Sequence, residues 1–305
     1  MPIYDALSRL IIEYDEAQQP DGEVYAHGSM RFGAALEGPP GRLHGGHHAF
    51  VRTLPIVERI TAHEHARTFP CSVDVVLQQG LNLEEDVPFE ATYRGDGDSW
   101  ELVTRFQATD RLVARAHSIP DEPLLTEAEL QHWRSLYEEA QPGDEHFHMF
   151  GFTVHLSKAL VWLEVNDPVK SLPESQHAAL VDSDGNFGAV FISTQLDTVG
   201  ATARGVVMRH PHFTKHIEID FATGRIPQET HLICMADRSR LEDVGDSGSA
   251  PVEIKGETYG TARAPVALVD AEFGRAYATG WVTVHPVDPA KFEALQRMRK
   301  IRKDP

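Results

Sequence analysis

The strongest constraint on the fold is an order of segments that occurs twice in the chain. In each half, an apolar segment of helix length precedes several segments in which apolar and polar residues alternate. Alternation with a period of two is typical of strands with one buried face, and a mostly apolar stretch of that length suits a helix packed in a core. The repeated order predicts an α+β protein with two similar halves.

In the first half, we expect a helix at Gly45–Ile60, which Pro55 should end or kink. Four strands are expected after it, and the Gly-Asp-Gly-Asp sequence at 95–98 favours a hairpin turn between the second and the third. The four strands are expected at Ser72–Gln79, Val87–Arg94, Trp100–Thr109 and Arg111–Ile119. Four such strands in succession predict an antiparallel meander.

The second half has the same order of segments. Strand-like stretches in Phe147–Glu164 precede an apolar segment of helix length, Val190–Ala203. Later strands are expected at Lys215–Ala222, Glu229–Met235, Ala262–Asp270 and Arg275–His285. The Gly-, Asp- and Ser-rich stretch Asp243–Gly256 is expected to be a surface loop.

This pattern divides the chain into an N-terminal domain at residues 1–125, a linker helix at 126–144 and a C-terminal domain at 145–305. Thr126 and Glu129 have the spacing of a capping box, which predicts a surface helix at Thr126–Ala140.

Composition excludes several classes of function. The 305 residues carry a formal net charge of −18, which argues against a general nucleic-acid binder. Two cysteines exclude a disulfide scaffold and a four-thiolate zinc site, and they fit a cytoplasmic protein. The chain has neither a basic start typical of a signal peptide nor 18 consecutive apolar residues, so we expect no membrane contact.

Two short stretches could carry chemistry. Leu43-His44-Gly45-Gly46 opens the first expected helix, where free backbone N–H groups favour developing negative charge on a ligand. Asp197 lies within the apolar segment of the second half, and a carboxylate buried there would have a raised pKa suited to base or nucleophile chemistry. The structural alternatives are a glycine-rich turn for the first stretch and a helix-capping Asp197 for the second.

Other patterns are weaker. The histidines near His44 lack a supporting carboxylate or thiol, so no metal site is expected. The sequence Gly-Asp-Ser-Gly-Ser at 245–249 looks like a protease nucleophile loop, but the remaining features of that family are absent. No phosphate-loop or dinucleotide fingerprint occurs, and no cofactor is expected.

A loop ending in His-Gly-Gly, a long helix and then antiparallel strands resembles the hotdog fold of acyl-CoA thioesterases. Leu196-Asp197-Thr198-Val199-Gly200 is similar to the Leu-Ala-Asp-Thr-Ala-Gly stretch of phenylacetate-type thioesterases. The resemblance implies a double hotdog, with two long central helices each wrapped by an antiparallel β-sheet. The function it implies is hydrolysis of an acyl thioester in lipid metabolism.

The sequence departs from that family in one respect. There the His-Gly-Gly and the acidic residue lie nine residues apart on one helix, whereas here Thr53 follows His44 by nine residues and Gly188 precedes Asp197 by nine. Because hotdog thioesterase sites lie between two subunits, a tandem copy needs each part only once. The resemblance therefore implies one composite site and one degenerate site.

In the composite site, the Gly45 or Gly46 amide would polarise the thioester carbonyl, and Asp197 would act as general base or nucleophile. Thr198 could position water, and His44 could bond the acyl group or shape the loop. The anionic carrier, CoA or an acyl carrier protein, requires a local basic site, for which the candidates are the C-terminal basic residues together with Arg204, Arg209 and Lys215.

Two alternatives stay open at this point. Double-hotdog dehydratases and hydratases place a His in the first half and an Asp in the second, as His44 and Asp197 do, although the His-x-x-x-Gly-x-x-x-x-Pro pattern is not matched. The other alternative is a non-catalytic acyl-binding module. Neither the acyl group nor the oligomeric state is readable from the sequence, and a homodimer of double hotdogs is one arrangement that the resemblance allows.

Overall fold

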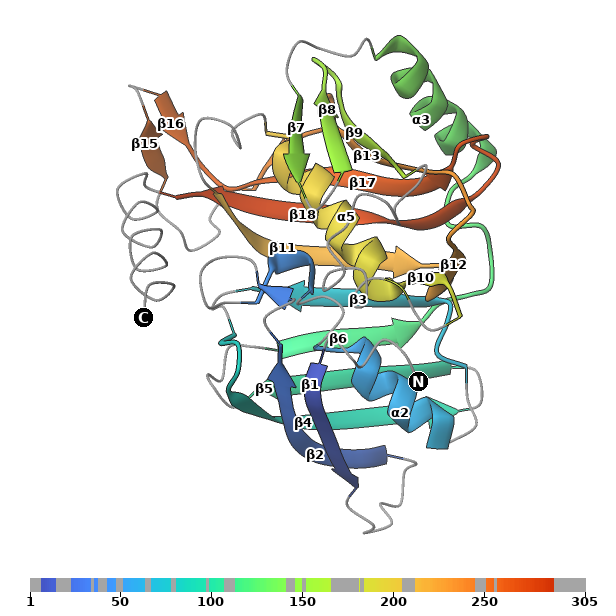
Figure 1. The fold of residues 1–305 in the computed structure, drawn as a ribbon, viewed down its shortest axis with the longest axis vertical. Helices are drawn as coiled ribbons and strands as arrows, with labels where there is room; N and C mark the ends of the chain where they lie inside the picture. Colours follow the sequence, from blue (N-terminus) through green and yellow to red (C-terminus); the bar gives the residue numbers. More distant parts are fainter. Residues whose placement is uncertain are drawn as a thin grey trace.

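The computed structural model places the elements labelled in Figure 1. It describes residues 7–14, 23–33, 36–37, 43–47, 52–63, 67–77, 81–96, 99–106, 113–140, 146–149, 152–165, 181, 184–204, 212–244, 251–254 and 257–287. Statements about structure below concern these residues.

The first half forms six neighbouring strands in the order β1-β2-β4-β5-β6-β3. The elements are β1 (Leu7–Tyr14), β2 (Glu23–Phe32), α2 (Leu54–His63), β3 (Cys71–Val76), β4 (Asp86–Asp96), β5 (Ser99–Phe106) and β6 (Val113–Ser118). All four strands predicted after the helix form. The predicted meander is correct only for β4–β6, because β3 pairs with β6 instead of β4.

The connection between β3 and β4 explains that difference. It crosses the sheet, and its buried Leu81 accepts a hydrogen bond through its carbonyl from the Leu43 N–H. Glu84, further along, donates its N–H to the Phe32 carbonyl at the end of β2. The crossing therefore brings β4 next to β2 and leaves β3 on the far side of the half.

The second half continues the sheet in the order β11-β18-β17-β13-β9-β8-β7. Its elements are β7 (His146–Met149), β8 (Phe152–Leu156), β9 (Leu160–Val165), β10 (Asn186–Gly188), α5 (Ala189–Thr202), β11 (His212–Phe221), β12 (Arg225–Pro227), β13 (Leu232–Asp237), β14 (Glu242–Asp243), β15 (Val252–Ile254), β16 (Glu257–Tyr259), β17 (Ala262–Asp270) and β18 (Ala276–Pro286). The predicted surface loop at Asp243–Gly256 is only partly irregular, because β15 pairs with β16 as a small hairpin.

The strand order repeats between the halves. In the first half, β2, β3, β4, β5 and β6 lie across the sheet in the order β2-β4-β5-β6-β3. In the second half, β9, β11, β13, β17 and β18 lie in the matching order β9-β13-β17-β18-β11. In each set the helix follows the first strand. The halves thus share a topology although their sequences do not visibly match.

The strands of the two halves form one continuous sheet, so the two helices are not each wrapped by a separate sheet. β3 pairs with β11 in antiparallel register, with Val75 opposite Ile217 and Asp74 opposite Glu218. Each of these strands would otherwise be the edge of its own half, with a row of unpaired backbone groups. Pairing them removes both edges and joins the halves rigidly.

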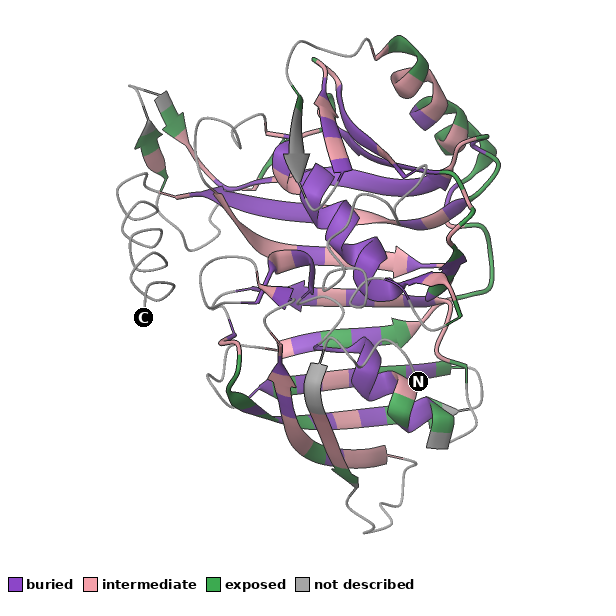
Figure 2. Ribbon diagram, in the orientation of Figure 1, coloured by how far each residue is buried: buried purple, intermediate pink, exposed green. Residues whose placement is uncertain are grey.

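Helices α2 and α5 lie on the same face of this sheet (Figure 1), whereas α3 (Glu127–Glu139) packs on the other face of the second half. Every residue of α5 except Ala201 is buried, as Figure 2 shows. The first helix is shorter than predicted: residues 45–47 are helical, residues 52–53 form a turn, and α2 begins only at Leu54. Pro55 explains this start, because it lacks the N–H that a helix interior needs and suits the first turn.

The predicted linker helix forms as α3 (Glu127–Glu139), and its capping box is confirmed by reciprocal bonds between Thr126 and Glu129. It packs on the second half through the buried Trp133, and His132 Nε2 lies 2.9 Å from the fully buried carboxylate of Asp237. None of the helices described is long and apolar enough to cross a membrane.

Candidate functional site

Asp197 lies in the middle of α5. The helix begins at Ala189, so Asp197 is its ninth residue and cannot cap it. Its side chain is 4% exposed. A carboxylate buried in a helix interior needs hydrogen-bond partners to offset the loss of water.

The partners of this carboxylate come from both halves. The Thr214 hydroxyl on β11 donates to Asp197 Oδ1 at 2.7 Å. The Gly46 N–H from the first half also donates to the carboxylate. His44 Nδ1 lies 3.7 Å from Asp197 Oδ2. The structure therefore brings His44, Gly46 and Asp197 together, as the composite site requires.

Burial raises the pKa of Asp197 to about 6. The hydrogen bond from Thr214, the nearby His212 and the Gly46 amide each oppose this rise. Asp197 is consequently ionised at neutral pH but holds its proton more strongly than an exposed aspartate, as suits a general base.

The loop before the first helical turn is held by backbone bonds. His44 donates its N–H to the Leu36 carbonyl at 3.0 Å, and His47 Nδ1 lies 3.1 Å from the same oxygen. These contacts fix the start of the turn at Leu36.

Both glycines permit a close approach to α5. A Cβ at Gly45 would lie 2.8 Å from Thr214 Oγ1 and 2.9 Å from Asp197 Oδ2. A Cβ at Gly46 would lie 2.7 Å from the Cα of Thr194. Any larger residue would push the two segments apart, which explains the glycines independently of any catalytic role.

The protonation of His44 follows from its contacts. The Gly46 N–H donates to His44 Nδ1 at 3.1 Å, so Nδ1 acts as an acceptor. Burial lowers the pKa of His44 to about 4, which keeps the ring neutral near pH 7. A neutral imidazole that accepts at Nδ1 carries its proton on Nε2. His44 is thus a hydrogen-bond donor at Nε2.

The two glycine amides differ in what they bind. The Gly46 N–H is already engaged by His44 and Asp197. The Gly45 N–H has no acceptor among the residues that the structure describes. The α-carbon of Gly45 lies close to Asp197, since a Cβ on it would meet Asp197 Oδ2.

The two threonines have different roles from those expected from sequence. Thr198 donates its hydroxyl to the Thr194 carbonyl within α5 at 2.8 Å, so its proton is not directed at the carboxylate. Thr214 was not a candidate, because a threonine in a strand is ordinary. A bulge in β11 between Thr214 and His216 lets Thr214 face Asp197 while His216 faces the other side of the sheet.

Of the expected carrier-binding residues, Arg204 is held by partners away from Asp197. Arg204 donates to the Gly260 carbonyl, stacks 5.6 Å from the ring of Tyr259, and lies 3.5 Å from Asp243. Lys215 uses its carbonyl to accept from Leu77 N–H at the bulge. Arg209 and the C-terminal basic residues lie outside the described residues.

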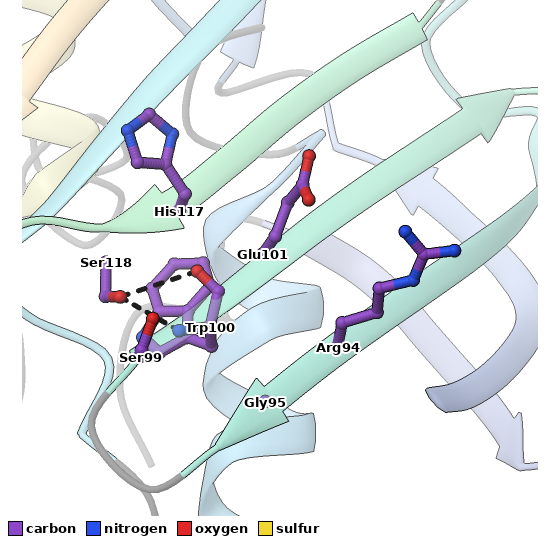
Figure 3. Close-up of a pocket in the computed structure, with 7 residues that line it drawn as sticks. All are labelled: Arg94, Gly95, Ser99, Trp100, Glu101, His117 and Ser118. Atoms are coloured by element: carbon purple, nitrogen blue, oxygen red, sulfur yellow. Dashed lines mark hydrogen bonds between the residues drawn. The ribbon is translucent and has the colours of Figure 1, made fainter. Parts of the chain in front are cut away.

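A shallow depression of about 560 Å³ lies elsewhere, on β4, β5 and β6 (Figure 3). It is lined by Arg94, Gly95, Ser99, Trp100, Glu101, His117 and Ser118. The Trp100 indole N–H donates to the Arg67 carbonyl and the Trp100 N–H donates to Ser118 Oγ, so the polar groups at its base are already paired. It contains none of the residues around Asp197.

A cluster of possible metal ligands lies at the junction of the halves, formed by Asp74, His216 and Glu218. His216 Nε2 is 2.7 Å from Asp74, whereas the opposite ring nitrogen, Nδ1, is 3.8 Å from Glu218. One ligand atom from each residue lies within 4.8 Å of the others, and all three side chains are partly buried. His216 is thus paired with two acids, and the hydrogen bond that it donates to Asp74 raises the pKa of His216.

Comparison with known proteins identifies the fold. The dehydratase domain of PpsC from Mycobacterium tuberculosis, in complex with C12:1-CoA, matches with a TM-score of 0.52 and 16% identity, over 92% of this chain and 98% of that one. A pyran synthase domain from module nine of the sorangicin pathway matches with a TM-score of 0.53 and 11% identity, over 93% and 98%. The fold is hotdog-like.

Other comparisons add less. A protein assigned as a thioesterase from Novosphingobium aromaticivorans superposes with a TM-score of 0.49 and 14% identity, over 93% of this chain and 99% of that one, which is too loose to bear on function. No protein-family model matches the chain. No curated protein matches it either. At such identities the likeness shows the fold and leaves the reaction to be argued from the site.

Proposed function

We propose that the protein hydrolyses acyl thioesters at a composite site between its two halves. One observation carries the proposal: the buried Asp197 of the second half, held by Thr214, lies against Gly45 of the first half, whose N–H has no acceptor among the described residues. A base and an oxyanion donor on opposite sides of one point are what attack on a carbonyl carbon requires.

The reaction uses these groups as follows. The thioester carbonyl oxygen accepts a hydrogen bond from the Gly45 N–H, and His44 Nε2–H serves as a second donor. Asp197 removes a proton from water as the water oxygen bonds to the carbonyl carbon. The tetrahedral intermediate then expels the thiolate, which takes up the proton. One amide donor of this type lowers the barrier by about 3 kcal/mol.

Asp197 could instead attack the carbonyl carbon directly, which would form an acyl-aspartyl anhydride that water then opens. A single turnover in ¹⁸O water separates the two routes. Water attack puts the label in the product acid, whereas water opening the anhydride at the aspartyl carbon leaves it on Asp197.

The repeated strand order supports a double hotdog, with residues 1–125 and 145–305 as the two domains. In this proposal the opposite site has lost its function: Thr53, nine residues after His44, lies in a turn before α2, and Gly188, the N-cap of α5, offers no side chain. In this proposal, each chain therefore has one functional site.

A lyase is the second candidate, favoured by the 3.7 Å approach of His44 to Asp197 and by the dehydratase domains among the matching structures. A dehydratase needs the histidine to accept a proton from the substrate α-carbon. His44 Nδ1 already accepts from Gly46 and its Nε2 is protonated, which favours hydrolysis.

A two-channel assay decides between them. The protein is incubated with acyl-CoA and 3-hydroxyacyl-CoA, and free thiol and enoyl absorbance are followed together. Thiol release that disappears in Asp197→Asn supports the thioesterase. Enoyl formation without thiol release supports the lyase, and ligand binding without either signal supports an acyl-binding module. Acyl carrier protein thioesters then replace CoA to identify the carrier.

A further inference from the structure

A second buried charged group lies in the first half, outside the site described above. Arg52 directly precedes Thr53 and is 0% exposed. Its Nη1 donates to the Val76 carbonyl at 3.0 Å, and its guanidinium lies 5.7 Å from the centre of the Phe106 ring. Among the described residues, its Nε and Nη2 atoms have no hydrogen-bond partner.

The two unpaired atoms lie on one edge of the guanidinium. Nε–H and the adjacent Nη2–H point in the same direction, with the spacing of the two oxygens of a carboxylate. Nη1, on the remaining side, is the atom that binds the protein. The arrangement leaves the bidentate edge open and uses the other side to fix the guanidinium in place.

An unpaired buried charge is costly. A guanidinium without an anion in a protein interior loses its hydration without compensation, and such charges are normally paired. Burial also lowers the pKa of Arg52 to about 9, still above neutral pH, so the group remains charged. No carboxylate of the described residues lies within reach as a salt-bridge partner.

Arg52 is connected to the catalytic carboxylate through the strand ends. Its Nη1 binds the Val76 carbonyl, and the next residue, Leu77, donates its N–H to the Lys215 carbonyl. Lys215 follows Thr214, whose hydroxyl binds Asp197. Arg52 and Asp197 therefore both lie near the end of the β3–β11 pairing at which β3 ends and β11 begins.

We infer that Arg52 binds a carboxylate at the distal end of the acyl group, so that the substrates are thioesters of dicarboxylic acids. This inference rests on the proposed thioesterase function for its catalytic part. The acyl chain runs from the thioester at Gly45 and Asp197 to the open edge of Arg52, where the two carboxylate oxygens accept from Nε and Nη2.

The kinetic test compares substrates that differ only in charge. Succinyl-, glutaryl- and adipyl-CoA are each assayed against their ω-methyl esters with wild-type protein, Arg52→Met and Arg52→Lys. We expect wild type to prefer the best acid over its ester by about 10- to 100-fold in kcat/KM, the range of a charge-assisted hydrogen bond. The ratio should fall to about one in Arg52→Met and to an intermediate value in Arg52→Lys.

The control is Arg105→Met, because Arg105 lies on β5 next to Phe106 but is exposed. It should keep the wild-type ratio. Equal acid-to-ester ratios in wild type and Arg52→Met would overturn the inference, as would a wild-type preference for the esters.

A binding measurement separates this inference from the proposed function. The thermal shift caused by glutarate is compared with that caused by dimethyl glutarate, which has no carboxylate. We expect glutarate alone to stabilise wild type and Asp197→Asn, and neither compound to stabilise Arg52→Met. If no thioester is hydrolysed but this pattern appears, the hydrolase proposal fails and the carboxylate site stands. If hydrolysis occurs and glutarate causes no Arg52-dependent shift, the carboxylate site fails.

Discussion

The hydroxyl of Thr214 and the carboxylate of Asp197 are 2.7 Å apart, and this bond ties strand β11 to helix α5 at the centre of the candidate site. The strand contributes the donor and the helix contributes the acceptor. Because the carboxylate is buried, this one bond both orients it and limits the rise of its pKa.

Thr214→Val should lower activity and move its pH dependence. The substitution keeps the shape but removes the hydroxyl that lowers the pKa of Asp197. We expect kcat to fall by about 10- to 100-fold, as for loss of a hydrogen bond to a charged group, and the acid limb of the pH profile to move to higher pH. Thr214→Ser should restore both. A pH profile that is unchanged in Thr214→Val would contradict the role assigned to this contact.

Asp197→Asn should abolish turnover while stabilising the fold at neutral pH. The folded-state pKa of about 6 exceeds the ordinary value of 3.8, so the stability that the protonated carboxyl provides is present below about pH 4 and is lost as the pH rises to about 6. At neutral pH the buried charge costs up to about 3 kcal/mol, for a difference of about two pKa units.

Urea unfolding of both proteins checks this sign. Asn removes the charge, so the variant should exceed wild type in free energy of unfolding at about pH 7, and the gain should shrink towards about pH 4. A gain of equal size at both pH values would show that ionisation of Asp197 is not its cause.

The two glycines should respond differently to alanine. At Gly45 the new methyl group would meet side-chain atoms of Thr214 and Asp197, so activity should fall at least about 100-fold with stability changed by less than about 1 kcal/mol. At Gly46 it would meet the backbone of Ser193 and Thr194, which cannot yield easily, and unfolding should become easier by about 2 kcal/mol. Thermal unfolding and kcat, measured together, test the contrast.

Trp133 should anchor α3 to the second half. It is the buried residue of that helix and packs in a separate apolar cluster with Trp162 and Phe273. Trp133→Ala should cost about 3–5 kcal/mol of stability, with faster hydrogen exchange in α3. Because the cluster does not include the site, kcat at low temperature should stay near wild type. Leu130→Ala, at a partly buried position of the same helix, serves as the milder control.

Part of this structure could be predicted from the sequence because it rests on local patterns. Alternation predicted β3–β6 and the main strands of the second half but missed β1 and β2, and the Thr126–Glu129 pair predicted the start of α3. Asp197 was identifiable because a carboxylate in an apolar helix is costly to bury. The hotdog-like fold was expected from a resemblance to acyl-CoA thioesterases in the order of these elements and in the glycine loop.

The rest depended on contacts between distant segments. Nothing local shows that β3 crosses to β6 and joins β11, since neighbouring strands in sequence are the usual partners. Thr214 reaches the helix only through a bulge that alternation does not reveal. Arg52 gave no signal either, because a single arginine before a helix is ordinary until its burial and unpaired edge are known.

The pairing of β3 with β11 sets the spacing between the groups of the proposed site. Thr214 and Lys215 adjoin that ladder on β11, and Val76 and Leu77 end it on β3, so the separation between acid, glycine loop and guanidinium is set by the register of six residue pairs. A single-residue insertion in β3 would turn every following side chain to the opposite face. Such an insertion would uncouple the two halves as a working unit even if each kept its own core.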